Sequence, residues 1–164
     1  MDIKIRNVTP GDERVVLEIF NYFVNNSFAA YTEHPEGSRF FQRLIEISKG
    51  YPFYVAENNS GEVVGFALLH PYYGIGVFRR AARITYFIKP ECTRHGLGKV
   101  FLDNIVVEAM KIGVDIILAS ISSRNEQSIS FHKKHGFVEC GRFKDVGIKW
   151  GKSFDEVWMQ YMVK

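Results

Sequence analysis

The stretch Arg94-His95-Gly96-Leu97-Gly98-Lys99 is the most informative part of this sequence. It follows an apolar run that ends at Ile88-Lys89-Pro90, and a helical pattern begins near Leu97. Glycine lets the backbone approach a ligand closely, and the free N–H groups at a helix start point the same way. The helix dipole adds partial positive charge there, and Arg94 and Lys99 add full charges. The stretch therefore predicts a loop that binds phosphate.

Apolar periodicity on both sides of this loop predicts a mixed α/β domain. Helices are expected over residues 10–26, 38–49, 97–112 and 125–134. Strands are expected over residues 3–6, 53–56, 63–68, 84–88, 114–120, 137–144 and 154–162, with 71–82 irregular and the last two strands split by Gly147 and Gly151. Because no repeat or linker interrupts the pattern, we expect one domain over residues 1–164.

Composition narrows the class of protein. A net charge of +3 over 164 residues suits local binding of an anion and is too small for the broad basic surface of a nucleic-acid binder. The longest apolar runs, such as residues 116–119, are too short to span a membrane, and the N-terminus has no signal-peptide pattern. Two cysteines, Cys92 and Cys140, cannot form a multi-bridge framework. We therefore expect a cytoplasmic protein with no nucleic-acid or membrane partner.

Three motifs in order resemble the GNAT acetyltransferase superfamily and, within it, the phosphinothricin acetyltransferase-like branch. The first is the glycine loop. The second is residues 121–137, which resemble the family's strand and helix ending in Gly-Phe, and the third is Val146-Gly147-Ile148-Lys149 with Gly151 and Asp155. The resemblance covers Ile3 to Met162. It implies an acyl-CoA N-acyltransferase fold, with a central, mostly antiparallel, twisted sheet flanked by helices.

The resemblance also implies acetyl-CoA as co-substrate and a primary amine as acceptor. The strand Tyr86-Phe87-Ile88 would offer backbone groups to the pantetheine arm and an N–H to the oxyanion. Asn125 would hydrogen-bond the same arm. The pyrophosphate would lie on Arg94, His95, Gly96, Leu97, Gly98 and Lys99.

Two residues are expected to handle protons. His132 occupies the place where many relatives have tyrosine and this branch has histidine. An imidazole with a pKa of about 6.5 can move a proton near neutral pH, so His132 is the expected acid for the CoA thiolate, alone or within a water chain. Glu33, in a Tyr-Thr-Glu that matches this branch, is the expected base or ammonium-binding group, directly or through water. A core histidine and a solvated carboxylate are the alternatives.

The acceptor half departs from the branch. Arg83 stands where a glutamate, proposed as the general base, is usual, and a guanidinium stays protonated. Tyr73 and Ile75 align with basic residues, whereas Arg79, after Phe78, matches a common arginine. The expected substrate-binding residues are Glu33, Tyr73, Phe78, Arg79 and Arg83. Thr93 and Ser153 also differ from the branch pattern.

These departures leave alternatives open. A small amino acid or analogue is the expected acceptor. The alternatives are an acyl-CoA-binding module that no longer transfers acetyl groups, and a protein or peptide N-terminal acetyltransferase. Cys92-x-x-His95 and His132-x-x-His135 have the spacing of zinc ligands, but both lie in segments with other expected roles, so no metal is expected. The branch further implies a homodimer.

Overall fold

The computed structural model describes residues 2–163 and has a mixed α/β architecture. Its helices are α1 (Glu13–Asn26), α2 (Ser38–Ile47), α3 (Leu97–Lys111) and α4 (Glu126–Lys134), with short 3-10 helices η1 (Pro10–Asp12), η2 (Gly76–Phe78) and η3 (Pro90–Cys92). Its strands are β1 (Lys4–Asn7), β2 (Phe53–Glu57), β3 (Val63–Pro71), β4 (Ala81–Ile88), β5 (Ile116–Ser122), β6 (Val138–Lys149) and β7 (Lys152–Met162).

The strands of residues 2–163 form one seven-stranded sheet in the order β1-β2-β3-β4-β5-β7-β6. Neighbouring strands are antiparallel except for β4 and β5, which run parallel. This arrangement confirms the expected mostly antiparallel sheet with flanking helices. No helix within the described residues has the length and apolar character needed to cross a membrane.

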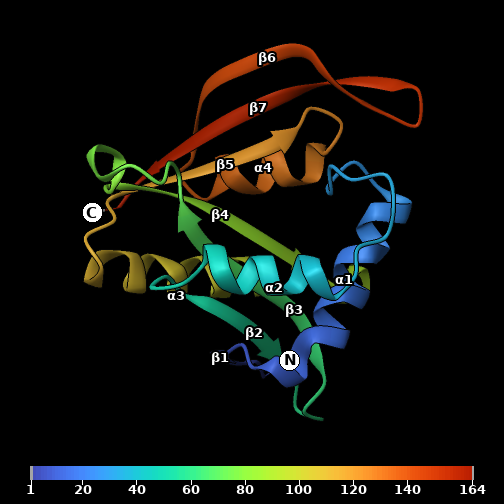
Figure 1. Cartoon of the computed structure of the whole chain (residues 1–164), viewed down its shortest axis with the longest axis vertical. Helices are drawn as coiled ribbons and strands as arrows, with labels where there is room; N and C mark the ends of the chain where they lie inside the picture. Colours follow the sequence, from blue (N-terminus) through green and yellow to red (C-terminus); the bar gives the residue numbers. More distant parts are fainter. Residues whose placement is uncertain (1, 164) are drawn as a thin grey trace.

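The parallel pair positions the site, because β4 and β5 diverge after a short contact. Ala81–Arg83 pair with Ile116–Leu118, and no further β4–β5 pair occurs within residues 2–163. Beyond this point β4 remains bonded only to β3, while β5 remains bonded to β7 as far as Ser122. Figure 1 shows the two strands separating toward their carboxyl ends, so the sheet opens in its middle.

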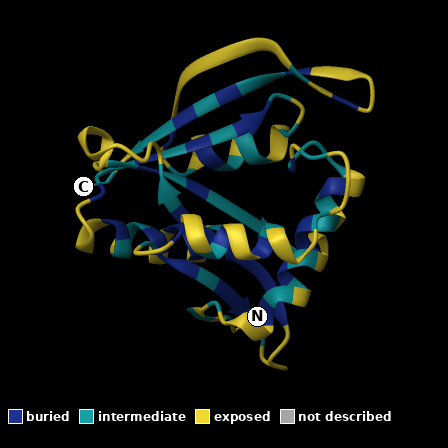
Figure 2. Ribbon diagram, viewed as in Figure 1, coloured by how far each residue is buried: buried dark blue, intermediate teal, exposed yellow. Residues whose placement is uncertain are grey.

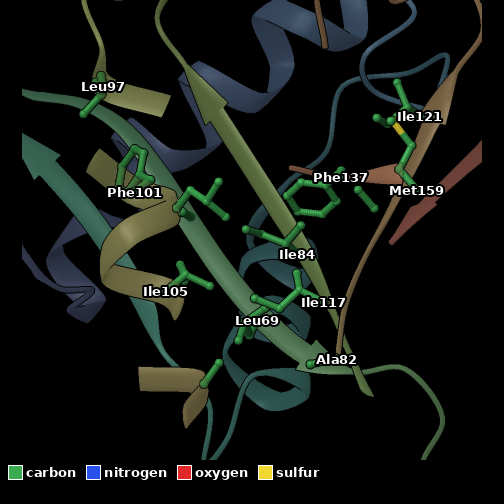
Figure 3. Close-up of a cluster of buried hydrophobic side chains, with 14 of the residues drawn as sticks. Leu69, Ala82, Ile84, Leu97, Phe101, Ile105, Ile117, Ile121, Phe137 and Met159 are labelled. Atoms are coloured by element: carbon green, nitrogen blue, oxygen red, sulfur yellow. The ribbon is translucent and has the colours of Figure 1, made fainter. Parts of the chain in front are cut away.

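The sheet carries an apolar core on each face. One core joins α3 to β3, β4, β5 and β7 and includes Phe101, Ile105 and Met159, all fully buried (Figure 3). The other joins α1 and α2 to β2 and β3 and includes Val16, Phe41 and Phe66. Helical spacing of the apolar residues in α1 and α2 produces this burial, as the sequence predicted.

Two segments differ from the sequence expectation. Residues 71–82 are not irregular throughout, because β3 continues to Pro71 and β4 already begins at Ala81. The final hairpin is also longer than expected: β6 continues through Gly147, and the turn lies at Trp150–Gly151. A Cβ on Gly147 would overlap the Phe154 ring, so glycine here allows close packing rather than ending the strand. Most of β6 is exposed (Figure 2).

Candidate acetyl-transfer cleft

A cleft of about 620 Å³ occupies the opening between β4 and β5. Residues of α1, the loop after it and α2 contribute to the lining, together with residues at the start of α3 and along α4. The charged side chains that line it are cations, namely Arg83, Arg94, Lys99 and Lys134. Within residues 2–163, no carboxylate lines it. The cleft is therefore suited to an elongated anionic ligand.

The bonding of β4 to β3 determines which backbone groups face this cleft. The N–H of Lys89 donates to the carbonyl of Val64 at 2.9 Å. Bonded positions alternate along an antiparallel pair, so Phe87 directs its N–H and carbonyl toward β3. The residues that direct these groups toward the open edge are Ile84, Tyr86 and Ile88. Phe87 lines the cleft as well.

The glycine loop lies at one end of the cleft. Gly96 is the N-cap of α3 with a φ of 85°, and Arg94 has a φ of 64°, so the chain turns sharply through left-handed conformations. No side chain caps α3 at Gly96. Its first N–H groups, with those of the preceding turn, form a concave set of donors suited to a phosphate.

Not every residue of this loop contributes its side chain to the cleft. Arg94, Gly96, Gly98 and Lys99 line it, whereas the Leu97 side chain is buried in the α3 core. His95 is exposed and lies outside the lining. A Cβ on Gly98 would approach the Phe131 ring to 3.0 Å, so glycine here lets α3 and α4 approach each other closely.

His132 on α4 is buried beside the cleft, and its two nitrogens have different partners. Nδ1 lies 2.7 Å from the carbonyl oxygen of Ser128, and Nε2 lies 2.5 Å from the hydroxyl of Tyr86. A carbonyl can only accept, so Nδ1 carries the proton and Nε2 accepts from Tyr86. Burial lowers the pKa of His132 to about 4, despite its bond to Ser128, and raises the pKa of Tyr86 well above its ordinary value. His132 is therefore neutral at neutral pH.

Asn125 begins α4 and lines the cleft beside the end of β5. Its side-chain oxygen accepts from the N–H of Ser128 at 3.2 Å, as expected of an N-cap residue. Its own N–H donates to the carbonyl of Ser122 at the end of β5. Because the N–H of Ser128 engages the side-chain oxygen of Asn125, the side-chain amide N–H groups of Asn125 are the donors available to a ligand in the cleft.

Arg83 lies at the other end of the cleft, where β4 leaves β5. Its guanidinium lies over the ring of Trp158, 5.0 Å from the centroid. Burial and the positive charge of Arg83 lower the pKa of the nearby His70. Arg83 therefore gives this end of the cleft a positive charge that is stacked on an aromatic ring.

Glu33 lies outside the cleft lining. Its carboxylate accepts the backbone N–H of Trp150 at 2.7 Å, and so joins the loop after α1 to the tip of the β6–β7 hairpin. Lys149 strengthens this junction, because its buried ammonium donates to the carbonyls of Ser27 and Ala30 at 2.7 and 2.8 Å. The motif at residues 146–149 included Lys149, but its burial was not expected, since a lysine in a surface hairpin is normally solvated.

Three further predicted residues lie away from the cleft. Tyr73 and Phe78 pack against each other in the β3–β4 loop, with ring centroids 5.5 Å apart. Arg79 donates to the carbonyl of Gly76 in the same loop. Among the predicted acceptor-site residues, the cleft of one chain therefore contains Arg83 alone.

A polar group that the sequence analysis missed lies on the acceptor side of the cleft. Ser120 of β5 lines the cleft and donates from Oγ to the Glu156 carboxylate of β7 at 2.5 Å. The hydroxyl of Tyr31 lies 3.0 Å from the same Oγ. The available signal was a serine in an apolar strand and a glutamate within a strand pattern, but their pairing depends on the β5–β7 register.

Comparison with known proteins agrees with this geometry. The chain matches the acetyltransferase (GNAT) domain family over residues 5–158. It is 30% identical over 162 residues to an L-methionine sulfoximine/L-methionine sulfone acetyltransferase of Pseudomonas paraeruginosa, covering 98% of this chain and 94% of that enzyme.

Two solved structures are similar over nearly the whole chain. A phosphinothricin acetyltransferase from Sinorhizobium meliloti in complex with acetyl-CoA has a TM-score of 0.93 at 28% identity, covering 99% of this chain and 89% of that one. A ribosomal-protein-alanine N-acetyltransferase from Brucella melitensis has a TM-score of 0.89 at 31% identity, covering 97% and 99%. The described residues contain no cluster of metal-binding side chains. The chain belongs to the GNAT acetyltransferase family and is an acetyl-CoA-dependent N-acetyltransferase.

Proposed function

We propose that this single GNAT domain transfers the acetyl group of acetyl-CoA to the primary amine of a small amino acid or amino acid analogue. The observation that carries the proposal is the cleft between β4 and β5, which combines an unpaired strand edge with a cationic glycine loop. The relatives named for methionine sulfoximine, methionine sulfone and phosphinothricin support an amino acid analogue as acceptor.

The donor occupies the cleft along β4. The pantetheine arm pairs with the carbonyl of Tyr86 and the backbone groups of Ile88, as a peptide strand would. Its pyrophosphate binds the N–H groups at the start of α3, with Arg94 and Lys99 supplying charge. Asn125 donates its side-chain N–H groups to the arm from the other side.

The oxyanion is stabilised by the N–H of Tyr86 at the open edge of β4. This choice follows from the alternation of the ladder, which directs the N–H of Phe87 toward β3 instead. One such donor contributes roughly 3 kcal/mol to transition-state stability. Direct attack by the amine then forms the carbon–nitrogen bond and releases CoA as a thiolate.

The proton for the thiolate comes through the pair of Tyr86 and His132. His132 is neutral, and its Nε2 already accepts the Tyr86 hydroxyl, so it orients that hydroxyl beside the thioester. The phenol and any water bound to it then form the path along which the CoA sulfur gains its proton. His132 thus retains a part in the proton path through its hydrogen bond to Tyr86.

Arg83 binds the carboxylate of the acceptor. Its guanidinium lines the cleft, and the stacked Trp158 restricts its orientation, so a bidentate contact loses little side-chain entropy. Glu33 acts on the acceptor site indirectly, by holding the loop after α1 against Trp150. The substitution of Arg83 for the branch's glutamate then changes how the acceptor is held and leaves acetyl transfer intact.

A homodimer in the cytoplasm is the proposed assembly and location. Apolar side chains of β6 are exposed in one chain, with Ile148 at 72%, Val146 at 60% and Phe143 at 58%. A second copy covering them would remove a large apolar area from water. Such a partner could also bring Tyr73, Phe78 and Arg79 to an acceptor site. Light scattering after size exclusion tests the dimer.

Free thiols at Cys92 and Cys140 suit a reducing compartment.

One assay tests the function. CoA release from acetyl-CoA is followed with a thiol reagent across amino acids, methionine sulfone, polyamines and an N-terminal alanyl peptide. We expect saturable turnover with an amino acid or analogue. The similarity to the Brucella enzyme favours the peptide as the second candidate acceptor. Binding of acetyl-CoA without CoA release from any amine would identify a binding module and contradict the proposal.

A further inference from the structure

We propose that Ser120 and Glu156 bind and deprotonate the acceptor's ammonium group, with Ser120 touching the amine and Glu156 acting through it. This inference deepens the proposed function and rests on it. Arg83 stands where the branch has a glutamate, and Glu33 is bonded to Trp150 outside the cleft lining. Glu156 would supply the carboxylate that neither position provides.

The hydrogen bonds of this group have one possible direction. A carboxylate only accepts, so Ser120 must give its single hydroxyl proton to Glu156. Tyr31 must then be the donor in its 3.0 Å contact with Ser120. Oγ of Ser120 therefore faces the cleft as an acceptor, with one lone pair still available, and Glu156 increases its negative character.

The electrostatics of the cleft favours an ammonium group at Oγ of Ser120. The charged side chains that line the cleft are cations, which repel an ammonium group. Arg83 and Glu156 both act on the hydroxyl of Tyr31, Arg83 lowering its pKa and Glu156 raising it, although burial dominates the overall rise. Arg83 and Glu156 therefore both lie near the hydroxyl of Tyr31. An amino acid, whose ammonium and carboxylate groups are attached to one α-carbon, matches these two opposite charges.

The sheet register explains why the two residues meet. Ser122 lies opposite Glu156, and Ser120 lies opposite Trp158, in the β5–β7 pair. Side chains alternate across a strand, so Ser120, Glu156 and Trp158 share one face, and Ile121 and Met159 lie on the other face in the core. The shared face is the one that carries Arg83 and Tyr31.

The acceptor is deprotonated before it attacks the thioester. The ammonium gives one proton to Oγ of Ser120 as Oγ gives its own proton to Glu156, which leaves a neutral amine. The nitrogen bonds to the acetyl carbon, the carbon–sulfur bond breaks, and the nitrogen's surplus proton passes to the thiolate through the path at Tyr86. Glu156 finally releases its proton to solvent.

Binding to the CoA-loaded protein tests the inference without requiring turnover. The ligands are L-methionine sulfone and its analogue in which hydrogen replaces the amino group, measured by calorimetry on wild type, Glu156→Gln and Ser120→Ala. A charged hydrogen bond of this kind corresponds to a preference of about 10-fold or more for the amino form. We expect wild type to show this preference and both variants to lose it. The double variant should bind the amino form no more weakly than either single variant.

The controls separate this role from a structural one. Gln at residue 156 can still accept from Ser120, so a merely structural role predicts an unchanged preference, which would overturn the inference. Glu108→Gln, a carboxylate paired with Lys111 on α3, should behave as wild type. In turnover, Glu156→Gln should raise the KM of the amine and lower kcat while leaving the KM of acetyl-CoA unchanged. If wild type releases no CoA with any amine, the proposed function fails, but the binding preference still decides the role of Glu156.

Discussion

The hydroxyl of Tyr86 on β4 donates to Nε2 of His132 on α4, and the two rings stack with an interplanar angle of 16°. Within residues 2–163, this hydrogen bond is the side-chain link between β4 and α4. The other nitrogen of His132 is engaged by Ser128 within α4. His132 is only 3% exposed, and both of its ring nitrogens have partners, as a buried histidine requires.

Replacing Tyr86 by phenylalanine removes the donor and keeps the stacked ring. We expect kcat for CoA release to fall about 100-fold, the lower range for loss of acid–base assistance, with the KM of acetyl-CoA nearly unchanged. His132→Asn should lower kcat similarly, and the double variant should be no worse because the two residues act as one unit. Steady-state kinetics measures this. Unchanged kcat in Tyr86→Phe would remove the pair from the proton path.

Acid should destabilise the fold through His132. Burial lowers its pKa to about 4, whereas in the unfolded chain the value is about 6.5, so below that pH the unfolded state binds a proton that the native state excludes. The contribution of neutral His132 to the free energy of unfolding is fully present above about pH 6.5 and is lost as pH falls through 4. It amounts to about 3 kcal/mol.

Urea denaturation between pH 7.5 and 4 measures this loss. His132→Asn should flatten the profile, and the exposed His34→Asn should not. His70 also has a lowered pKa and contributes in the same direction, so some slope should remain. Asp12, held by Arg6 at a pKa of about 2, loses its contribution only at lower pH and does not confuse the comparison. An identical profile for wild type and His132→Asn would contradict the assignment.

Local sequence predicted those parts of the site that are contiguous. The glycine loop with the start of α3, and the start of α4 near Asn125, depend on neighbouring residues, so spacing was sufficient. The end of β3 and the start of β4 were missed because pairing with neighbouring strands extends them to Pro71 and Ala81, where the local pattern is weak.

Contacts between distant segments could not be predicted in this way. Ser120 meets Glu156, and Glu33 meets Trp150, only because the β5–β7 register and the hairpin tip bring them together. Motif matching placed Glu33 near the acceptor by resemblance to the branch. It could not indicate that the carboxylate would be engaged by a backbone N–H of this chain's own hairpin.

Two substitutions at Glu33 distinguish holding from chemistry. Glutamine keeps an oxygen that can accept from the N–H of Trp150, whereas alanine leaves that N–H without the carboxylate. If Glu33 holds the loop, Glu33→Gln should have near-wild-type activity and Glu33→Ala should raise the KM of the amine several-fold. Steady-state kinetics with a saturating donor measures both. Equal, large losses in the two variants would instead restore Glu33 as a base or ammonium-binding group.

Gly98 tests the link between the glycine loop and the donor. A Cβ there would lie 3.0 and 3.1 Å from atoms of the Phe131 ring, which packs edge-on against Tyr86. To relieve the contact, Phe131 and the start of α3 must shift apart by a few tenths of an ångström, and we expect the first N–H groups of α3 to move with it. We expect Gly98→Ala to weaken CoA binding about 10-fold, roughly the loss of one charged hydrogen bond. Gly74→Ala, which meets nothing within 4 Å in the β3–β4 loop, is the matched control. Calorimetry with CoA decides, and equal affinity in Gly98→Ala and Gly74→Ala would show that the pyrophosphate does not depend on the start of α3.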